Sequence, residues 1–203
     1  MTEPEPAAPS PRAVRARGIE RRAQIVDAAA AFALQHGIAA LSHRQVAAAA
    51  QVPLGSTTYY FGSLDELRAA AVERMLVGDA ERRRLALGEQ LPADVSAPDL
   101  AWRLIDVVVG LPRLDDPIQV ALLYERLAEA VRSPELAEVL KGASGELLAD
   151  VAQLLSGTPW AGADPQAILA LIDGRAIGWL TLGDTRQHVF VDGIAADLER
   201  HRR

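Results

Sequence analysis

The chain has no cysteine. This absence excludes disulfide bridges, thiolate metal sites and thiol-based catalysis, and it agrees with a reducing compartment. Aromatic residues are also scarce, at 4% of the 203 residues, whereas alanine is plentiful. Alanine favours helices, and sheets are usually rich in aromatic residues. The composition therefore predicts an all-α protein.

Long apolar runs are missing as well. No stretch approaches the roughly 20 apolar residues of a transmembrane helix, and the proline-rich, acidic N-terminus is unlike a signal peptide. Half of all residues are nevertheless hydrophobic, which is enough to bury a core. We expect a globular, cytoplasmic protein without a membrane partner.

The motifs of common enzyme classes are absent too. The sequence has no nucleophile elbow, no Walker loop and no His-Glu-x-x-His motif, and none of its four histidines stands at ligand spacing from another. The segment GSTTYYFG lacks the lysine of a phosphate-binding loop. We therefore expect no enzyme activity, no catalytic residue, no metal site and no cofactor.

Positive charge is scarce overall but concentrated near the N-terminus. The whole chain has a net charge of −6, yet residues 1–64 carry six arginines against four acidic residues, a net +2, and residues 65–203 carry −8. Five of the six arginines fall between Arg12 and Arg22. If the chain binds DNA, its first part binds it, although a solvated helix start would also account for these arginines.

Residues 42–61, SHRQVAAAAQVPLGSTTYYF, predict two short helices joined by a tight turn. Ser42 and Gln45 form a capping box that starts the first helix, and Pro53 suits the first turn of the second. This is the pattern of a helix-turn-helix motif, in which the second helix enters the DNA major groove. Phe61 ends the motif and is expected to fill the core beside it.

Apolar periodicity and turn residues divide the remaining chain into helices. One helix over about residues 19–35 precedes the motif, and residues 1–17 are expected to form a flexible basic arm. With those of the motif, about nine helices are predicted. The six that follow the motif span about residues 64–87, 99–111, 118–132, 134–155, 165–182 and 185–200.

Residues 19–67 resemble the DNA-binding domain of TetR-family transcriptional regulators. The resemblance rests on the helix spacing, the alanine-rich second helix and the ending Gly-Ser/Thr-x-x-Tyr-Tyr-Phe. It implies an N-terminal three-helix helix-turn-helix domain over residues 18–63 and a larger helical ligand-binding and dimerisation domain over residues 64–203. The implied partners are a double-stranded DNA operator, a small-molecule effector and a second copy of the chain.

The resemblance also assigns DNA contacts to individual residues. Three positions depart from the family: Gln51 replaces the usual turn glycine, and Leu54 and Leu64 stand where basic residues are common. A positive φ at Gln51 would cost about 1 kcal/mol or more. Backbone contacts are implied for Ser42 and Arg44, base or phosphate contacts for Pro53, Leu54, Gly55, Ser56 and Thr57, and contacts with phosphates and thymine methyls for Thr58, Tyr59 and Tyr60.

Purely structural roles stay open for several of these side chains. Because Leu54 and Leu64 weaken the hold on the DNA backbone, we infer that the arginines between Arg12 and Arg22 supply it. The residues that could instead be corner aromatics or plain helix surface are Tyr59, Tyr60, Thr57, Thr58 and Arg44.

The last two predicted helices carry the features of a subunit interface. Gly174 and Gly178 lie four residues apart on one helix face and permit close approach of another helix. Ile194 and Leu198 belong to an apolar stripe on the final helix. In TetR-like proteins the last two helices form the dimer, so these four residues are the predicted interface; packing within one chain is the alternative.

A ligand pocket is harder to locate from the sequence. The candidates are large or charged side chains beside apolar positions, and a place in the core or on the surface is the alternative for each. We select Trp102, Tyr124, Trp179 and Arg175, and note that Asp173 and Arg175 could form an ion pair.

Together these features predict a ligand-responsive DNA-binding regulator. The resemblance implies that it is a repressor, because most members of the family repress transcription. A two-fold dimer presents recognition helices about 34 to 36 Å apart and so requires a near-palindromic operator. The helix over residues 64–87 belongs to both parts, so a ligand that shifts it would change that spacing. A helical protein-protein adaptor without DNA binding is the alternative, but an adaptor has no need of a positive N-terminal third.

Overall fold

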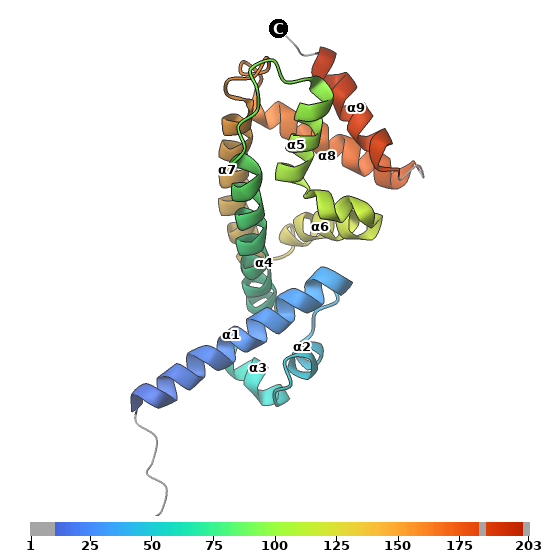
Figure 1. The fold of residues 1–203 in the computed structure, drawn as a ribbon. Coiled ribbons are helices and arrows are strands. Elements are labelled where there is room, and N and C mark those ends of the chain that lie inside the picture. Colours follow the sequence, from blue (N-terminus) through green and yellow to red (C-terminus); the bar gives the residue numbers. More distant parts are fainter. Residues whose placement is uncertain (1–10, 183–185, 201–203) are drawn as a thin grey trace, which may run out of the picture.

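The computed structural model describes residues 11–182 and 186–200, and within these ranges the chain forms nine α-helices, one short 3-10 helix and no strand (Figure 1). The all-α fold with an N-terminal helix-turn-helix is confirmed. None of the described helices combines the length and the apolar character needed to cross a membrane. The elements are α1 Pro11–His36, α2 His43–Ala49, α3 Leu54–Tyr60, α4 Leu64–Leu87, α5 Ala97–Val108, η1 Leu111–Asp115, α6 Pro117–Ala130, α7 Pro134–Leu155, α8 Pro165–Thr181 and α9 Gln187–Arg200.

Helices α1, α2 and α3 form one end of the molecule, here called the α1–α3 module, and α1 extends well beyond the other two (Figure 1). It begins at Pro11 rather than near Ile19, so the expectation of a flexible arm is wrong for residues 11–17. Proline suits a first helical turn, and the alanines and arginines after it are good helix formers. Residues 1–10 of the expected arm lie outside the described ranges.

Local signals set the helix ends around the turn. Ser42 Oγ accepts a hydrogen bond from the Gln45 backbone N–H at 3.3 Å, as the capping box predicts. The Gln45 side chain reaches back to the hydroxyl of Ser42, which donates to Gln45 Oε1 at 2.6 Å. Ser63 caps α4 in the same way, accepting from the Glu66 N–H at 3.0 Å. Gln51 has a φ of 54°, in the left-handed region, so this turn carries the strain expected where a glycine is replaced.

Two hydrophobic cores meet along α4. The core of the α1–α3 module combines alanines with branched aliphatic side chains, and Phe61, 1% exposed, occupies its predicted place there. The first half of α4 contributes Leu67, Ala70, Ala71, Val72 and Met75 to this core. Ala86, near the end of α4, belongs to the second core. The boundary expected after residue 63 thus marks the start of a shared helix and not a division between the cores.

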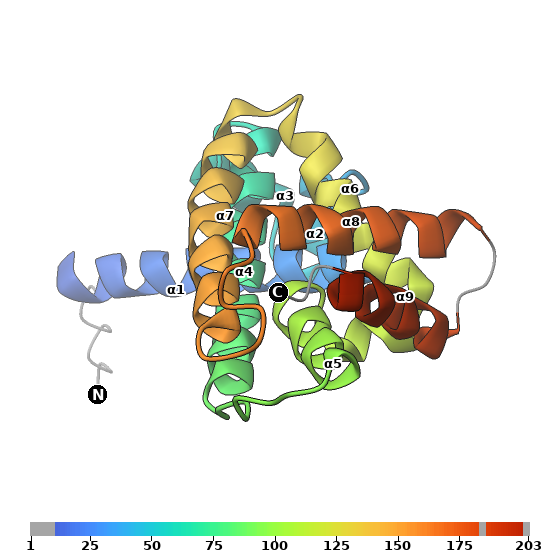
Figure 2. The same cartoon turned by 90° about the horizontal axis from the view of Figure 1, so that it is seen from above.

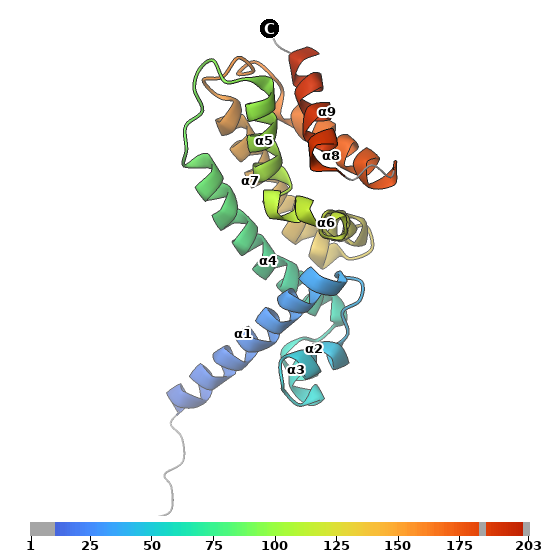
Figure 3. The same cartoon turned by 45° about the vertical axis from the view of Figure 1, so that its right-hand side comes forward.

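The other helices surround the far end of α4 (Figure 3). Helices α4 and α7 run side by side, and α5 packs against α9 (Figures 1 and 2). Trp160, after α7, is 1% exposed and donates its indole N–H to the Leu198 carbonyl at 2.8 Å. The predicted loop at residues 112–117 contains most of η1, and the predicted start of the last helix at residue 185 lies outside the described residues.

Candidate nucleic-acid interface and ligand cavity

The outer face of α3 presents four of the residues that were predicted to meet DNA. Leu54 and Tyr59 are 51% and 81% exposed, and Gly55 and Thr58 lie exposed between them. Pro53 precedes the helix as its N-cap. A Cβ at Gly55 would meet nothing within 4 Å, so the backbone there is open to close approach. This face is available for contacts outside the chain.

Thr57 does not belong to this face. Its side chain is fully buried, and its hydroxyl donates a hydrogen bond to the Leu54 carbonyl at 2.8 Å and lies 3.5 Å from the His43 carbonyl. A seven-residue helix must turn one face inward to pack, and Thr57 occupies that face of α3. The DNA contact predicted for its side chain is therefore wrong; Thr57 joins α3 to α2.

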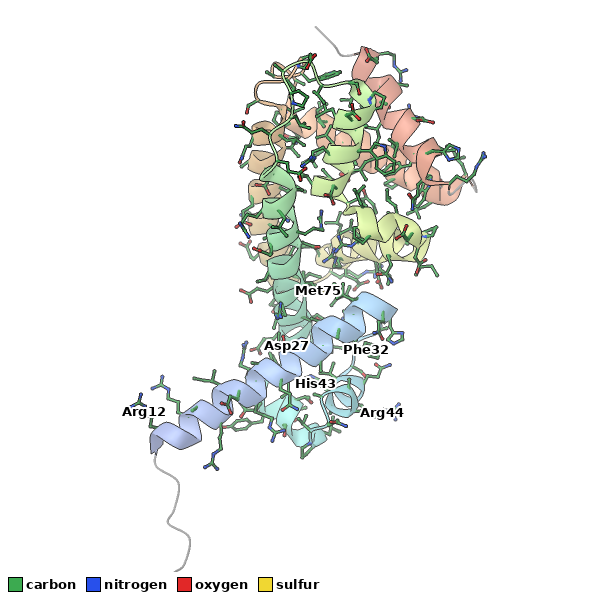
Figure 4. The ribbon with its side chains drawn as sticks, in the orientation of Figure 1. Arg12, Asp27, Phe32, His43, Arg44 and Met75 are labelled. Atoms are coloured by element: carbon green, nitrogen blue, oxygen red, sulfur yellow. The ribbon has the colours of Figure 1, made fainter. Side chains whose placement is uncertain are left out.

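Of the remaining residues predicted to contact DNA, some are exposed and others make contacts within the chain. Arg44 is exposed and projects from α2 at the edge of the α1–α3 module (Figure 4). The Ser42 hydroxyl is engaged in its capping box. Tyr60 is half-buried, its ring meets that of Tyr59 edge to face at 5.0 Å, and its hydroxyl lies beside Gly18 of α1. Tyr60 thus fits the corner-aromatic alternative, whereas Tyr59 faces outward.

An open groove of about 680 Å³ lies between the first half of α1 and α3. Arg17 and Arg21 line its α1 wall, and the half-buried Ser56 and the exposed Tyr59 line its α3 wall. Arg12 lies farther out, near the free end of α1 (Figure 4). Exposed guanidinium groups beside hydroxyl groups are the side chains that bind a phosphate backbone.

A second space, the inner cavity, lies between α4, α6, α7 and α8 and has a volume of about 370 Å³. This volume is within the range of about 300 to 1,000 Å³ that is typical of small-molecule sites. Tyr124 is the predicted pocket residue that lines it. Most of its wall is aliphatic and includes Leu76, Leu123, Leu127, Leu140, Leu147 and Leu169.

A tyrosine-carboxylate pair lies on the wall of the inner cavity. Tyr124 donates its hydroxyl proton to Asp173 Oδ1 at 2.8 Å, joining α6 to α8. Burial raises the pKa of Asp173, and the hydrogen bond from Tyr124 opposes this rise in part. Burial and the charge of Asp173 raise the pKa of Tyr124, which therefore stays protonated. This pair joins two helices, so neither partner could be found from the periodicity of one.

Arginines outnumber carboxylates on the α4 side of the inner cavity. Asp79 accepts a hydrogen bond from Arg113 at 2.5 Å and lies 3.6 Å from Arg126, and Arg82 pairs with Asp106 at 3.2 Å. Burial lowers the pKa of Arg126 and of Arg82, because it disfavours their charged forms, and Asp79 counteracts this. We call these five residues the arginine cluster; its formal charge is +1.

The three other predicted pocket residues do not line the inner cavity, and their ligand-binding role stays a prediction. Trp179 and Arg175 line a separate space between α8 and α9. Trp102 is 39% exposed and lines a surface groove. Trp179 is buried and stacks on Phe190 with ring centroids 5.6 Å apart. Arg175 pairs with Asp197 of α9 at 2.6 Å and not with Asp173. Helix periodicity identifies a buried face, but it cannot say whether that face borders a cavity or a packed core.

Glu125 connects α6 to the α1–α3 module. Its carboxylate accepts hydrogen bonds from the backbone N–H groups of Ile38 and Ala39, both at 3.2 Å. These amides follow Gly37, whose φ of 88° turns the chain after α1, and a Cβ on Gly37 would clash with the Glu125 carboxylate. Because Glu125 follows Tyr124 directly, α6 contacts both the inner cavity and the α1–α3 module.

The solvent-facing side of α8 carries two glycines and an exposed apolar side chain. A Cβ at Gly174 or Gly178 would meet nothing within 4 Å, and Ile177 is 52% exposed beside them. Ile194 and Leu198, in contrast, are fully buried in the core that α9 shares with α5. The interface role predicted for these two is wrong, because their stripe packs within the chain and leaves no surface for a partner.

Two family models match the chain. The model of bacterial regulatory proteins of the tetR family matches residues 25–71, which include the C-terminal part of α1, all of α2 and α3, and the start of α4. The model of the tetracyclin repressor-like C-terminal domain matches residues 95–200, which include helices α5 to α9. No curated protein matches the chain.

Solved structures of similar fold cover most of the chain. The multidrug binding protein EbrR in complex with proflavin is 34% identical over 89% of this chain and 98% of its own, with a TM-score of 0.66. Its complex with ethidium is 35% identical over 90% and 99%, with a TM-score of 0.65. A TetR-family member from Streptomyces coelicolor A3 is 33% identical over 91% and 99%, with a TM-score of 0.59.

Proposed function

This chain belongs to the TetR family of bacterial regulatory proteins and is thus a DNA-binding transcriptional regulator, and we propose that it is a homodimeric repressor that a small molecule releases from its operator. Repression is typical of the family, whose members are generally not enzymes. The outer face of α3 is the observation that carries the proposal, since the exposed ring of Tyr59 contributes little to the fold. The expected site of action is the cytoplasm, where an operator is accessible.

In this proposal α3 is the recognition helix. Leu54, Gly55 and Thr58 would meet base edges or nearby phosphates, and Tyr59 would contact a phosphate or a thymine methyl. Arg44 would bind the backbone from α2. Their exposure supports this assignment, and the absence of a Cβ at Gly55 would let the helix sit deep in the groove.

The first half of α1 would add to the backbone contacts. Arg12, Arg15 and Arg17 are exposed on a helix that extends past α3, and the last of these lines the groove beside Tyr59. A helix holds these guanidinium groups in fixed positions, which a flexible arm would not do. They would offset the loss of basic side chains at Leu54 and Leu64.

The dimer would form through α8 and α9 of two copies. Gly174 and Gly178 leave room for close helix approach, and the exposed Ile177 supplies apolar surface. Such a dimer would place two copies of α3 about 34 to 36 Å apart, so that the operator would be a near-palindrome.

The inner cavity would be the effector site. It is lined by Tyr124 and Asp173, and two of its walls, α4 and α6, also contact the α1–α3 module. A ligand that binds one arrangement of α6 more tightly than another would change the position of the module through α4 and Glu125. EbrR binds proflavin and ethidium, so these two dyes test whether the inner cavity of this chain shares that ligand preference.

The experiment is a fluorescence anisotropy titration of labelled DNA from upstream of the protein's own coding region, repeated over a range of salt concentrations. Replacing Arg12, Arg15 and Arg17 by Ala should weaken binding and reduce the salt slope by about one for each arginine that contacts a phosphate. The control is Arg84→Ala, an exposed arginine outside the α1–α3 module, which should change neither. An unchanged slope would contradict the role of α1. Failure of the native chain to bind any operator would favour an adaptor.

A further inference from the structure

We propose that Arg126 is an anion-binding residue of the inner cavity, and that the effector is an amphiphile with an aliphatic body and one carboxylate. The inference rests on the proposed effector role of the cavity and adds the chemical class of the ligand. It starts from a buried guanidinium group, one nitrogen of which has no hydrogen-bond partner among the described residues.

Arg126 is 3% exposed, yet among the described residues no acceptor meets its Nη1 atom. Its nearest carboxylate, that of Asp79, lies 3.6 Å from Nη2, beyond hydrogen-bond range, and is already bonded to Arg113 at 2.5 Å. A buried guanidinium normally has its donors satisfied, because an unmade bond to a charged group costs stability. Arg126 therefore has donor capacity that a ligand can use.

The rest of the arginine cluster strengthens the preference for an anion. Arg82 also lines the cavity, and its buried Nε has no partner among the described residues. Gly110, with a φ of 92°, allows Arg82 and Arg113 to pack over the backbone, since a Cβ there would come within 2.8 Å of Arg113. Three guanidinium groups against two carboxylates leave one positive charge that a bound carboxylate would neutralise.

The walls of the inner cavity indicate the shape of the ligand's body. They are mostly aliphatic, with leucine the commonest residue, and Tyr124 is the aromatic residue among them, so the cavity suits a flexible aliphatic chain better than a stacked flat ring. Burial of such a chain supplies the apolar part of the binding energy, and a guanidinium fork holds a carboxylate by two parallel bonds.

Two acidic residues, Asp79 and Asp173, line the inner cavity, and Asp173 is the one outside the arginine cluster. It accepts a hydrogen bond from Tyr124, and burial favours its neutral form by raising its pKa. Arg83, the third arginine of the lining, is paired with Asp150 at 2.6 Å and with Glu146 at 3.6 Å. Arg126 and Arg82 are therefore the arginines of the cavity wall that have unpaired N–H donors for an anion.

The test is calorimetric titration with decanoate and with decyltrimethylammonium, which share an aliphatic chain and differ in the sign of the headgroup. Decanoate should bind the native chain more tightly. Arg126→Met should weaken decanoate binding about ten- to a hundredfold and should not weaken binding of the cation, because it removes a like charge. Arg132→Met, which removes an exposed arginine just after α6, is the matched control and should change neither affinity.

Thermal unfolding without ligand distinguishes a binding role from a structural one. Arg126→Met should melt at the same temperature as the native chain or higher, because Asp79 keeps Arg113 and an unsatisfied buried charge is removed. A lower melting temperature with unchanged decanoate affinity would overturn the proposal. If Arg126→Met does not fold, Arg126→Lys decides: it keeps the charge without the fork and should bind decanoate several-fold more weakly.

Tighter binding of the cation, or no decanoate binding at all, would also overturn the proposal. These outcomes are independent of DNA binding. Failure of operator binding with intact decanoate recognition would refute the repressor and leave the anion site standing.

Discussion

At the end of the molecule formed by the α1–α3 module, called the DNA end for its proposed role, Tyr59 and Arg44 are exposed to solvent. The hydrophobic core behind them does not include them. At the other end, called the ligand end for its proposed role, the reverse holds: Arg126 is buried and Asp79 and Arg82 are partly buried in the leucine-lined wall of the inner cavity. Because the polar groups at the DNA end stay in solvent, folding does not desolvate them, and their substitution should leave the core intact. Those at the second end are part of the interior, so changes there affect stability and binding together.

The buried carboxylate at the centre of the arginine cluster gives the largest expected effect. Asp79→Asn removes the partner of Arg113 and of Arg126 and should lower the free energy of unfolding by about 3 to 5 kcal/mol. Asp27→Asn, which breaks an exposed pair with Arg74 in the other half of the molecule, should cost less than about 1 kcal/mol. Urea unfolding of both variants checks this, and equal losses would remove the distinction between the two ends.

The second largest effect is expected at Glu125, which links α6 to the α1–α3 module. Glu125→Ala removes two hydrogen bonds to backbone amides and should cost about 1 to 2 kcal/mol, less than a fully buried pair because the carboxylate is partly exposed. Hydrogen exchange should accelerate at the amides of Ile38 and Ala39. Glu138→Ala, which removes an exposed carboxylate paired with Lys141, is the control. Unchanged exchange at both amides would show that α6 does not hold the module.

The two ends also differ in how far the sequence predicts them. The capping role of Ser42 and the core position of Phe61 are predicted correctly, because caps and turns depend on a few neighbouring residues. Thr57 was misassigned because a two-turn helix has too few apolar positions to show which side faces inward.

At the ligand end the required information is long-range. The stripe of Ile194 and Leu198 predicts a buried face, but the same stripe suits a neighbour in the same chain or in a second copy. Tyr124 and Asp173 are 49 residues apart, and Glu125 meets the module across 86 and 87 residues. No spacing rule connects such positions, so the cavity and the link become visible only in the fold.

A smaller effect tests the turn of the α1–α3 module. Gln51→Gly should raise the free energy of unfolding by about 1 kcal/mol, since glycine adopts a positive φ without the cost that a Cβ imposes. Gln51→Ala keeps the Cβ and should bring no such gain. Thermal unfolding measures both, and equal stability of the two variants would show that the turn is not strained.

The smallest effect concerns pH at the ligand end. Burial raises the pKa of Asp173 above its usual value of 3.8, so the folded chain holds this proton more tightly than the unfolded chain. The stabilisation is complete below the usual pKa and is lost as pH rises through the raised one. Asp173→Asn should lack this loss and be at least as stable as the native chain at neutral pH. A native chain that gains stability over the variant through this window would contradict the shift.

The most direct test of the central claim, that α3 reads DNA with side chains the fold does not need, is the operator affinity of Tyr59→Ala. Anisotropy titration should show a loss of about tenfold or more at an unchanged melting temperature, because the ring is 81% exposed. Val77→Ala, at an exposed position on α4, should change neither quantity. Native affinity in Tyr59→Ala would contradict the account.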